Sequence, residues 1–200
     1  MKLNWAERWA VNNSLRVIQQ RLEMRWLRKN SDFKPGALVL EVGCGRGAGA
    51  RLILQQFHPA FLQAMDLDIG MIRKARDYLS QESGKRISFY VGDAFRLPYK
   101  DETLDALFGF GVLHHIPDWQ SALLEIARVL KTGGIYFLEE LYPSLYQNFI
   151  TKHILLHPRE NRFLSQDLKQ ALIAANLHLE NSLELPKIGI FGISIKGTDR

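Results

Sequence analysis

The chain has 200 residues, of which 46% are hydrophobic and 24% are charged, as in an ordinary globular protein. This length fits one domain, which we expect over residues 1–200, and the single cysteine excludes an internal disulfide and favours a reducing compartment. The net charge of +5 permits anionic substrates, nucleic acid or a lipid surface as partners and requires none of them.

Residues 1–30 are predicted to form a helix with one apolar face. Leu15, Ile18, Leu22 and Trp26 recur at steps of three and four residues. Basic residues lie mostly elsewhere around this helix, at Arg8, Arg16, Arg21, Arg25, Arg28 and Lys29. We interpret the segment as a helix packed at the domain edge with a solvated basic face. Two alternatives stay open: a lid over an active site, and a surface helix in peripheral contact with anionic lipid.

Neither a secretion signal nor a membrane span is expected. Glu7, Asn12 and Asn13 lie where a signal peptide needs an apolar core. No apolar run approaches the roughly 18 residues of a membrane-spanning helix. We therefore expect a cytoplasmic protein.

A short apolar strand, a glycine-rich turn and a helix follow. The run 37–42 predicts a buried strand, and residues 50–57 predict the helix. Between them glycine recurs at every second position, at Gly43, Gly45, Gly47 and Gly49. This arrangement directs free backbone N–H groups and a helix N-terminus at a polar ligand. Because Gly43, Gly45 and Ala48 also fit a looser dinucleotide pattern, the motif alone does not identify the ligand.

Three carboxylates lie at the ends of predicted strands. Glu41 precedes the first glycine by two residues, and Asp66 and Asp93 end or follow the next two strands. A pyrophosphate would gain little from so many acids nearby, because like charges repel at short range. A cationic ligand with an amino group, a sulfonium and a ribose would suit them.

The rest of the chain alternates strands with helices. Strands are predicted at 61–66, 87–91, 104–110 and 135–139, and helices from Asp68 onward and over 117–130. The strand 104–110 is apolar throughout, as is typical of a central parallel strand covered on both faces. This alternation predicts a parallel sheet with right-handed crossovers.

The pattern loosens after Glu139. Residues 141–163 are interpreted as a substrate-side insertion with a helix-like piece over 145–156. Ser165 is the expected N-cap of a helix over 166–175, and Asn176 its expected stop. Two strands, 177–185 and 188–196, are predicted to close the sheet as an antiparallel pair.

Five sequence blocks in order resemble the class I S-adenosylmethionine-dependent methyltransferases: residues 39–49, 64–72, 92–98, 113–118 and 125–134. The resemblance covers roughly residues 35–140 closely and the C-terminal part more loosely. It implies an α/β, Rossmann-like, doubly wound seven-stranded sheet, mostly parallel with an antiparallel C-terminal strand. It also implies S-adenosyl-L-methionine as the cofactor.

The resemblance assigns the adenosyl end of the cofactor to residues after the second and third strands. Asp66 would accept hydrogen bonds from both ribose hydroxyls, a role that its position at a strand end also permits. Asp93 would accept from the adenine amino group, with the Ala94 N–H opposite the ring nitrogen. Leu67 and Phe95 would sandwich the adenine, although Phe95 fits ordinary core packing equally well.

The methionine end is assigned to the glycine turn and the fourth strand. The residues at 43–47, namely Gly43, Cys44, Gly45 and Gly47 with Arg46 between them, would supply backbone contacts. Glu41 would meet the amino group directly or through water, with loop N–H groups compensating its burial. Phe110 and Gly111 would border the sulfonium. We interpret Cys44 as a small structural residue and Asp68 as a helix N-cap.

Candidates for a catalytic role follow the fourth and fifth strands. His114 and His115 would serve packing and helix-start hydrogen bonds, or one of them would act as a base. Glu140 and Tyr142, with Glu139, are candidates for substrate contact. No cysteine or carboxylate has metal-ligand spacing to the histidines, so no metal is expected.

The predicted function is S-adenosylmethionine-dependent methyl transfer, an enzyme activity of EC 2.1.1 type, to a small-molecule or lipid-like acceptor by in-line displacement. Residues 97–101 and 114–115 resemble the quinone-biosynthesis and phospholipid-methylating branches. The fourth strand ends Gly109-Phe110-Gly111 and lacks the motif for methylating nucleic-acid bases, so nucleic acid is not the expected partner. The alternatives are a non-catalytic cofactor-binding module of the same fold, a nucleic-acid or protein methyltransferase, and an NAD-dependent oxidoreductase.

Overall fold

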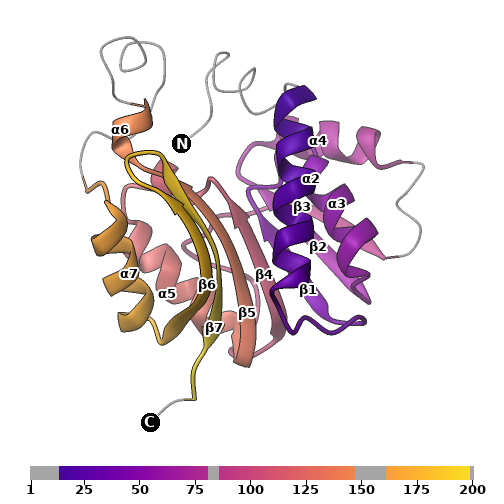
Figure 1. The fold of residues 1–200 in the computed structure, drawn as a ribbon. Helices are drawn as coiled ribbons and strands as arrows, with labels where there is room; N and C mark the ends of the chain where they lie inside the picture. The colour runs from indigo at the N-terminus through magenta and orange to yellow at the C-terminus, as the bar shows by residue number, and fades with distance from the viewer. Residues whose placement is uncertain (1–13, 81–85, 147–160, 199–200) are drawn as a thin grey trace.

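Seven strands form one sheet in the order β3-β2-β1-β4-β5-β7-β6 (Figure 1). The computed structural model describes residues 14–80, 86–146 and 161–198. The strands are β1 Leu38–Val42, β2 Phe61–Asp66, β3 Ile87–Val91, β4 Leu104–Phe110, β5 Leu130–Leu141, β6 Leu177–Leu185 and β7 Gly189–Lys196. Strands β1 to β5 pair in parallel, whereas β7 is antiparallel to both β5 and β6. The predicted α/β, doubly wound architecture is confirmed.

Helices cover both faces of the sheet (Figure 1). They are α2 Ser14–Lys29, α3 Ala48–Phe57, α4 Ile69–Tyr78, α5 Trp119–Val129, α6 Pro143–Tyr146 and α7 Ser165–Ala174, with a 3₁₀ turn η1 at Leu113–His115. Side chains of α2, α3 and α4 share one core with β1 and β4, and those of α5 and α7 share the other. No helix in the described ranges is long and apolar enough to cross a membrane.

The chain order reverses between β1 and β4, which creates the crevice where ligands bind in such sheets. From β1 the chain builds outward through β2 and β3, and it then returns to place β4 on the other side of β1. The loops after β1 and β4 therefore diverge to opposite faces and leave a gap above the carboxyl ends of the strands.

Aromatic rings stiffen the sheet beneath this crevice. Phe108 of β4 stacks on Phe137 of β5 with ring centroids 4.3 Å apart, and Phe57 of α3 packs edge-on against both rings. All three side chains are fully buried. Burial of this size contributes roughly 1.5–3 kcal/mol per side chain, which fixes α3 and the glycine turn relative to β4.

The start of the fifth strand and the N-cap of α7 differ from prediction, and the other described boundaries agree with it to within two residues. The fifth strand starts at Leu130 and not at 135, because a bulge absorbs residues 131–134 opposite the start of β4. Ser165 is the first residue of α7, and Leu164 is its N-cap. Asp167, three residues on, accepts a hydrogen bond from the Leu164 N–H (2.8 Å), which is the half of a capping box that a carboxylate at this position provides.

Other predicted elements agree with the structure over the described residues. The second, third and fourth strands have the predicted bounds, and Asp68 caps α4 by accepting from the Gly70 N–H at 2.8 Å. Of the helix predicted over 1–30, residues 14–29 are described and helical. The predicted packing face is wrong, because the buried side chains of this helix are Met24 and Leu27, whereas Ile18 and Leu22 are 56% and 60% exposed. The helix-like piece expected over 145–156 lies mostly outside the described residues.

Candidate cofactor site

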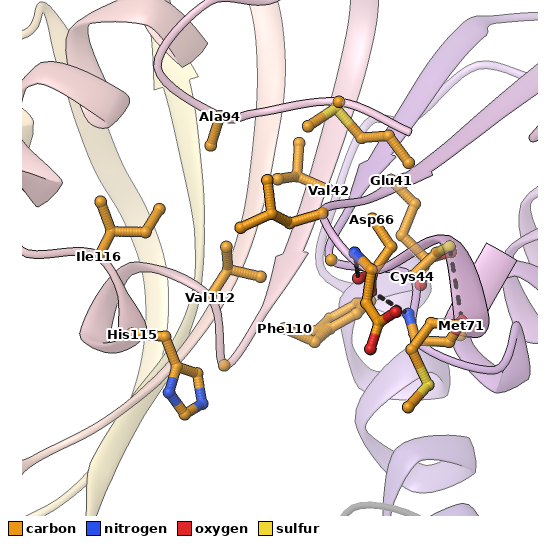
Figure 2. Close-up of a pocket in the computed structure, with 18 of the residues that line it drawn as sticks. Glu41, Val42, Cys44, Asp66, Met71, Ala94, Phe110, Val112, His115 and Ile116 are labelled. Atoms are coloured by element: carbon orange, nitrogen blue, oxygen red, sulfur yellow. Dashed lines mark hydrogen bonds between the residues drawn. The ribbon is translucent and has the colours of Figure 1, made fainter. Parts of the chain in front are cut away.

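A cavity of about 250 Å³ lies in the crevice between the loops that follow β1 and β4. Every predicted cofactor residue except Gly47 lines it: Glu41, Gly43, Cys44, Gly45, Asp66, Leu67, Asp93, Ala94, Phe95, Phe110 and Gly111. Figure 2 shows Glu41, Cys44 and Asp66 on one side and Val112 and His115 on the other. Glu41 and His115, which are 74 positions apart in the sequence, thus share one cavity.

The glycine turn places backbone close to the cavity. Gly47 has φ +89° and forms the N-cap of α3 without a side-chain cap, and a Cβ there would lie 3.2 Å from that of Ala75. It therefore serves close packing of α3 on α4, which explains why it does not face the cavity. A Cβ on Gly49 would collide with the Glu41 carboxylate. Only glycine lets the first turn of α3 approach that acid.

Asp66 ties the turn to β2 and still faces the cavity. Its Oδ2 accepts a hydrogen bond from the Gly45 N–H (2.9 Å) and its Oδ1 accepts from the Asp68 N–H (2.8 Å). Burial raises the pKa of this carboxyl, and the two N–H donors oppose that rise. Each carboxylate oxygen keeps a further lone pair, so Asp66 can accept a pair of hydroxyl groups, as a ribose would present them.

Glu41 is the buried acid of the cavity. Glu41 is only 3% exposed, and its Oε2 has no hydrogen-bond partner among the described residues. The expected compensation by loop N–H groups is therefore not found among the described residues. Burial, with a smaller contribution from the charge of Asp66, raises the pKa of Glu41 to about 8. An unpaired acid in this position suits a ligand ammonium group, so the residues present fit the expected cofactor.

This carboxyl predicts a pH dependence of stability. In the unfolded chain it titrates near pH 4.5, whereas in the folded chain it keeps its proton up to about pH 8. The folded state thus binds more protons in this window, and the free energy of unfolding falls with rising pH, by up to about 1.4 kcal/mol per pH unit. Glu41→Gln has no proton to lose, so in urea unfolding its stability relative to wild type should rise from pH 5.5 to 7.5. Parallel pH profiles would contradict this assignment.

The residues predicted to hold adenine lie at the mouth of the cavity. Asp93 accepts a hydrogen bond from the Phe95 N–H (3.1 Å), which shapes the turn after β3. Leu67 is 46% exposed and Phe95 is 41% exposed, and both line the cavity. The alternative that Phe95 packs in the core is therefore wrong. Two exposed apolar side chains at one opening are suited to holding an aromatic ring between them.

Phe95→Ala should weaken the binding of S-adenosylhomocysteine by roughly two- to tenfold, the value of one aromatic contact of about 0.5–1.5 kcal/mol. Isothermal titration calorimetry on the full chain measures this change. Leu124→Ala is the matched control, because Leu124 is exposed on α5, which packs on the other face of the sheet. Equal affinities for wild type and Phe95→Ala would remove Phe95 from the site.

Cys44 has the properties of a structural residue. It is buried and free, and its backbone N–H donates to the Met65 carbonyl at 2.9 Å, which joins the turn to β2. Burial and the neighbouring acids Glu41 and Asp66 raise the pKa of its thiol. A protonated thiol is a poor nucleophile, so this environment disfavours covalent chemistry at Cys44.

Glu140 and His114 form a buried anchor under the opposite wall. The Glu140 carboxylate accepts hydrogen bonds from the backbone N–H groups of Val112 (3.2 Å), Leu113 (2.8 Å) and His114 (3.2 Å). It also lies 2.7 Å from His114 Nδ1. Neither side chain lines the cavity. Their positions point to a role in holding the loop after β4 rather than in touching an acceptor.

His115 is the candidate that the structure brings to the cavity. It lines the wall with Val112 and Ile116 (Figure 2), and its ring packs against that of His114 with centroids 4.3 Å apart. Tyr142 lies elsewhere, buried, and its hydroxyl donates to Glu184 of β6 at 2.8 Å. Glu139 is also buried and its carbonyl accepts from the Gly111 N–H. No cluster of potential metal ligands occurs among the described residues.

The sequence reasoning missed several lining residues. Gln20 of α2 reaches the cavity, as do Met71 of α4, Ile116 and Pro117. Of these residues, only Gln20 comes from a distant segment. It precedes Met24 and Leu27 by four and seven residues and so shares their buried face of α2. A polar residue at that spacing from two apolar ones was the available sequence signal.

The sheet order and the glycine turn at the crevice define a nucleotide-cofactor fold of the methyltransferase type. Residues 40–138, about half of the chain, match the methyltransferase domain family. The chain therefore belongs to the class I S-adenosylmethionine-dependent methyltransferases, and the family implies S-adenosyl-L-methionine as its cofactor.

Relatives with curated names are about a third identical to part of the chain over the regions that match. A sterol 24-C-methyltransferase of Gibberella zeae is 34% identical over 62% of this chain and 33% of its own length. A phosphoethanolamine N-methyltransferase of Caenorhabditis elegans is 31% identical over 56% and 25%. A fatty-acid O-methyltransferase of Mycolicibacterium smegmatis is 35% identical over 54% and 38%. The matches thus span well under half of the length of these relatives.

Solved structures share the fold at low identity. A S-adenosylmethionine-dependent methyltransferase from Aquifex aeolicus superposes with a TM-score of 0.73 at 16% identity, covering 98% of this chain and all of its own. A chain from the Haloferax volcanii complex of the Trm112 methyltransferase activator superposes with a TM-score of 0.77 at 18% identity, covering 96% of both chains. These likenesses establish the fold alone.

Proposed function

We propose that the chain transfers a methyl group from S-adenosyl-L-methionine to a small-molecule or lipid-like acceptor. The observation that carries this proposal is one cavity with two acids on one side and an apolar wall on the other. Glu41 and Asp66 lie on the acid side, and Val112 and Ile116 on the apolar side. The relatives named for sterols, phosphoethanolamine and fatty acids support an acceptor of this class.

Different residues of the cavity would bind different parts of the cofactor. S-adenosyl-L-methionine, when bound, supplies an electrophilic methyl group on a sulfonium. Asp66 would hold the ribose and Glu41 the ammonium group, while Phe110 and Gly111 would border the sulfur. Keeping the acids away from the sulfur favours the reaction, because a nearby negative charge would stabilise the cation that the transition state discharges.

The opposite wall would receive the acceptor. Val112 and Ile116 exclude water and align an apolar acceptor for in-line attack, which supplies much of the rate in a reaction of this kind. A hydroxyl or amine acceptor must also lose a proton. Of the predicted catalytic residues, His115 is the one at this wall, and its imidazole can take that proton. The Glu140–His114 anchor beneath it fixes the loop that carries it.

A transfer assay tests the proposal. The full chain is incubated with methyl-labelled S-adenosyl-L-methionine and with lipid, small-molecule, RNA and protein fractions of a cell extract. We expect label in the lipid or small-molecule fraction. Label confined to RNA or protein would favour the macromolecular alternative. Binding of the cofactor with no label in any fraction would favour a non-catalytic module.

A further inference from the structure

Helix α2 carries a basic hollow that the cofactor site does not use. Its lining consists of Arg21, Arg25, Arg28 and Lys29 of α2 with Leu52, Gln55 and Gln56 of α3, around a volume of about 570 Å³. No residue of this basic hollow lines the cofactor cavity. The α3 side contributes only neutral groups, so the hollow has one sign of charge.

The four cations of the basic hollow have no acidic partner in the part of the chain that the structure describes. The structure gives none of them an ion pair with a carboxylate within residues 14–80, 86–146 and 161–198. Like charges that are four residues apart destabilise a helix. Helix α2 has two such pairs here, Arg21 with Arg25 and Arg25 with Lys29. An anion bound over the hollow would relieve this repulsion.

Exposed aliphatic side chains continue the same stripe of α2. Ile18 is 56% exposed and Leu22 is 60% exposed, and with Arg25 and Lys29 they follow steps of four, three and four residues. Aliphatic side chains beside cations match the boundary of a bilayer, where acyl chains meet phosphate groups. A nucleic-acid surface would instead be expected to offer aromatic rings for stacking on bases.

We propose that α2 docks on a bilayer that contains anionic phospholipid. The lipid phosphates lie over the basic hollow, and Ile18 and Leu22 enter the headgroup region. Gln20 of the same helix lines the cofactor cavity, so docking brings that cavity close to the membrane surface. The proposal concerns binding alone and does not depend on methyl transfer.

Vesicle co-sedimentation of the full chain tests this docking. We expect pelleting with phosphatidylcholine vesicles that contain phosphatidylglycerol and little with phosphatidylcholine alone. Arg25→Glu with Lys29→Glu should reduce partitioning at least about tenfold, because each cation near an anionic surface contributes on the order of 1 kcal/mol. Ile18→Ser with Leu22→Ser should weaken the binding that persists at high salt.

Arg73→Glu with Lys74→Glu is the matched control, because both residues are exposed on α4 and the charge change is the same. Thermal unfolding and S-adenosylhomocysteine binding verify that each variant is folded. Equal loss of pelleting in the two charge variants would overturn the proposal, as would equal pelleting with and without phosphatidylglycerol. Binding of an RNA oligonucleotide that is lost in the α2 variant, without vesicle binding by wild type, would also overturn it.

Discussion

Asp66→Ala is expected to weaken the binding of S-adenosylhomocysteine by at least about tenfold and, with both ribose hydroxyls held, by about a hundredfold or more. Each charge-assisted hydrogen bond contributes roughly 1.5–3 kcal/mol, and roughly 1.4 kcal/mol is a factor of ten. The substitution also removes the acceptor that binds the Gly45 and Asp68 N–H groups. The glycine turn would then lose one of its links to β2 and keep the hydrogen bond from the Cys44 N–H to the Met65 carbonyl. Isothermal titration calorimetry measures the loss.

Two further variants separate these effects. Asp66→Asn keeps the shape of the side chain and removes its charge, so it should retain more of the fold while still losing affinity. Asp77→Asn is the matched control, because Asp77 is exposed on α4 and does not line the cavity. Wild-type affinity in both Asp66 variants would contradict the assignment of the ribose site.

Glu140→Ala is expected to destabilise the protein by about 3–5 kcal/mol. The substitution leaves three buried backbone N–H groups and the His114 ring without their common acceptor. Urea unfolding at neutral pH measures this change. Glu180→Ala, at an exposed position on β6, should stay within about 0.5 kcal/mol of wild type.

The Glu140 experiment also distinguishes anchoring from catalysis. If the carboxylate only anchors the loop, Glu140→Gln should recover part of the stability, because the amide oxygen still accepts from one or two of the N–H groups. A Glu140→Ala variant as stable as wild type would contradict the anchor.

The central sheet could be predicted from the sequence because its signals are local. The runs at β2 and β4 are short and apolar, and β2 ends in the acid Asp66, at the sheet edge where ligands bind. Asp68 was recognisable as a cap because the group it caps is two residues away. The residues predicted to hold the cofactor were assigned by the family resemblance, which rests on sequence blocks at or just after the ends of strands.

The parts that were missed depend on contacts distant in sequence. Glu140 was taken as a candidate for substrate contact, and its partners lie 26 to 28 residues earlier, on a loop that only the pairing of β4 with β5 brings near. Gln20 reaches the cavity because α2 packs across α3. No local pattern encodes these two contacts. The start of α7 is a different case, because the hydrogen bond from the Leu164 N–H to Asp167 lies within one turn and was missed locally.

A crystal structure with S-adenosylhomocysteine is the most direct test that the acids and the glycine turn form a cofactor site. We expect the ribose hydroxyls within hydrogen-bonding distance of Asp66, the amino group beside Glu41 and the adenine between Leu67 and Phe95. A cavity left empty at saturating ligand, or a ligand bound elsewhere with these side chains turned away, would contradict the account.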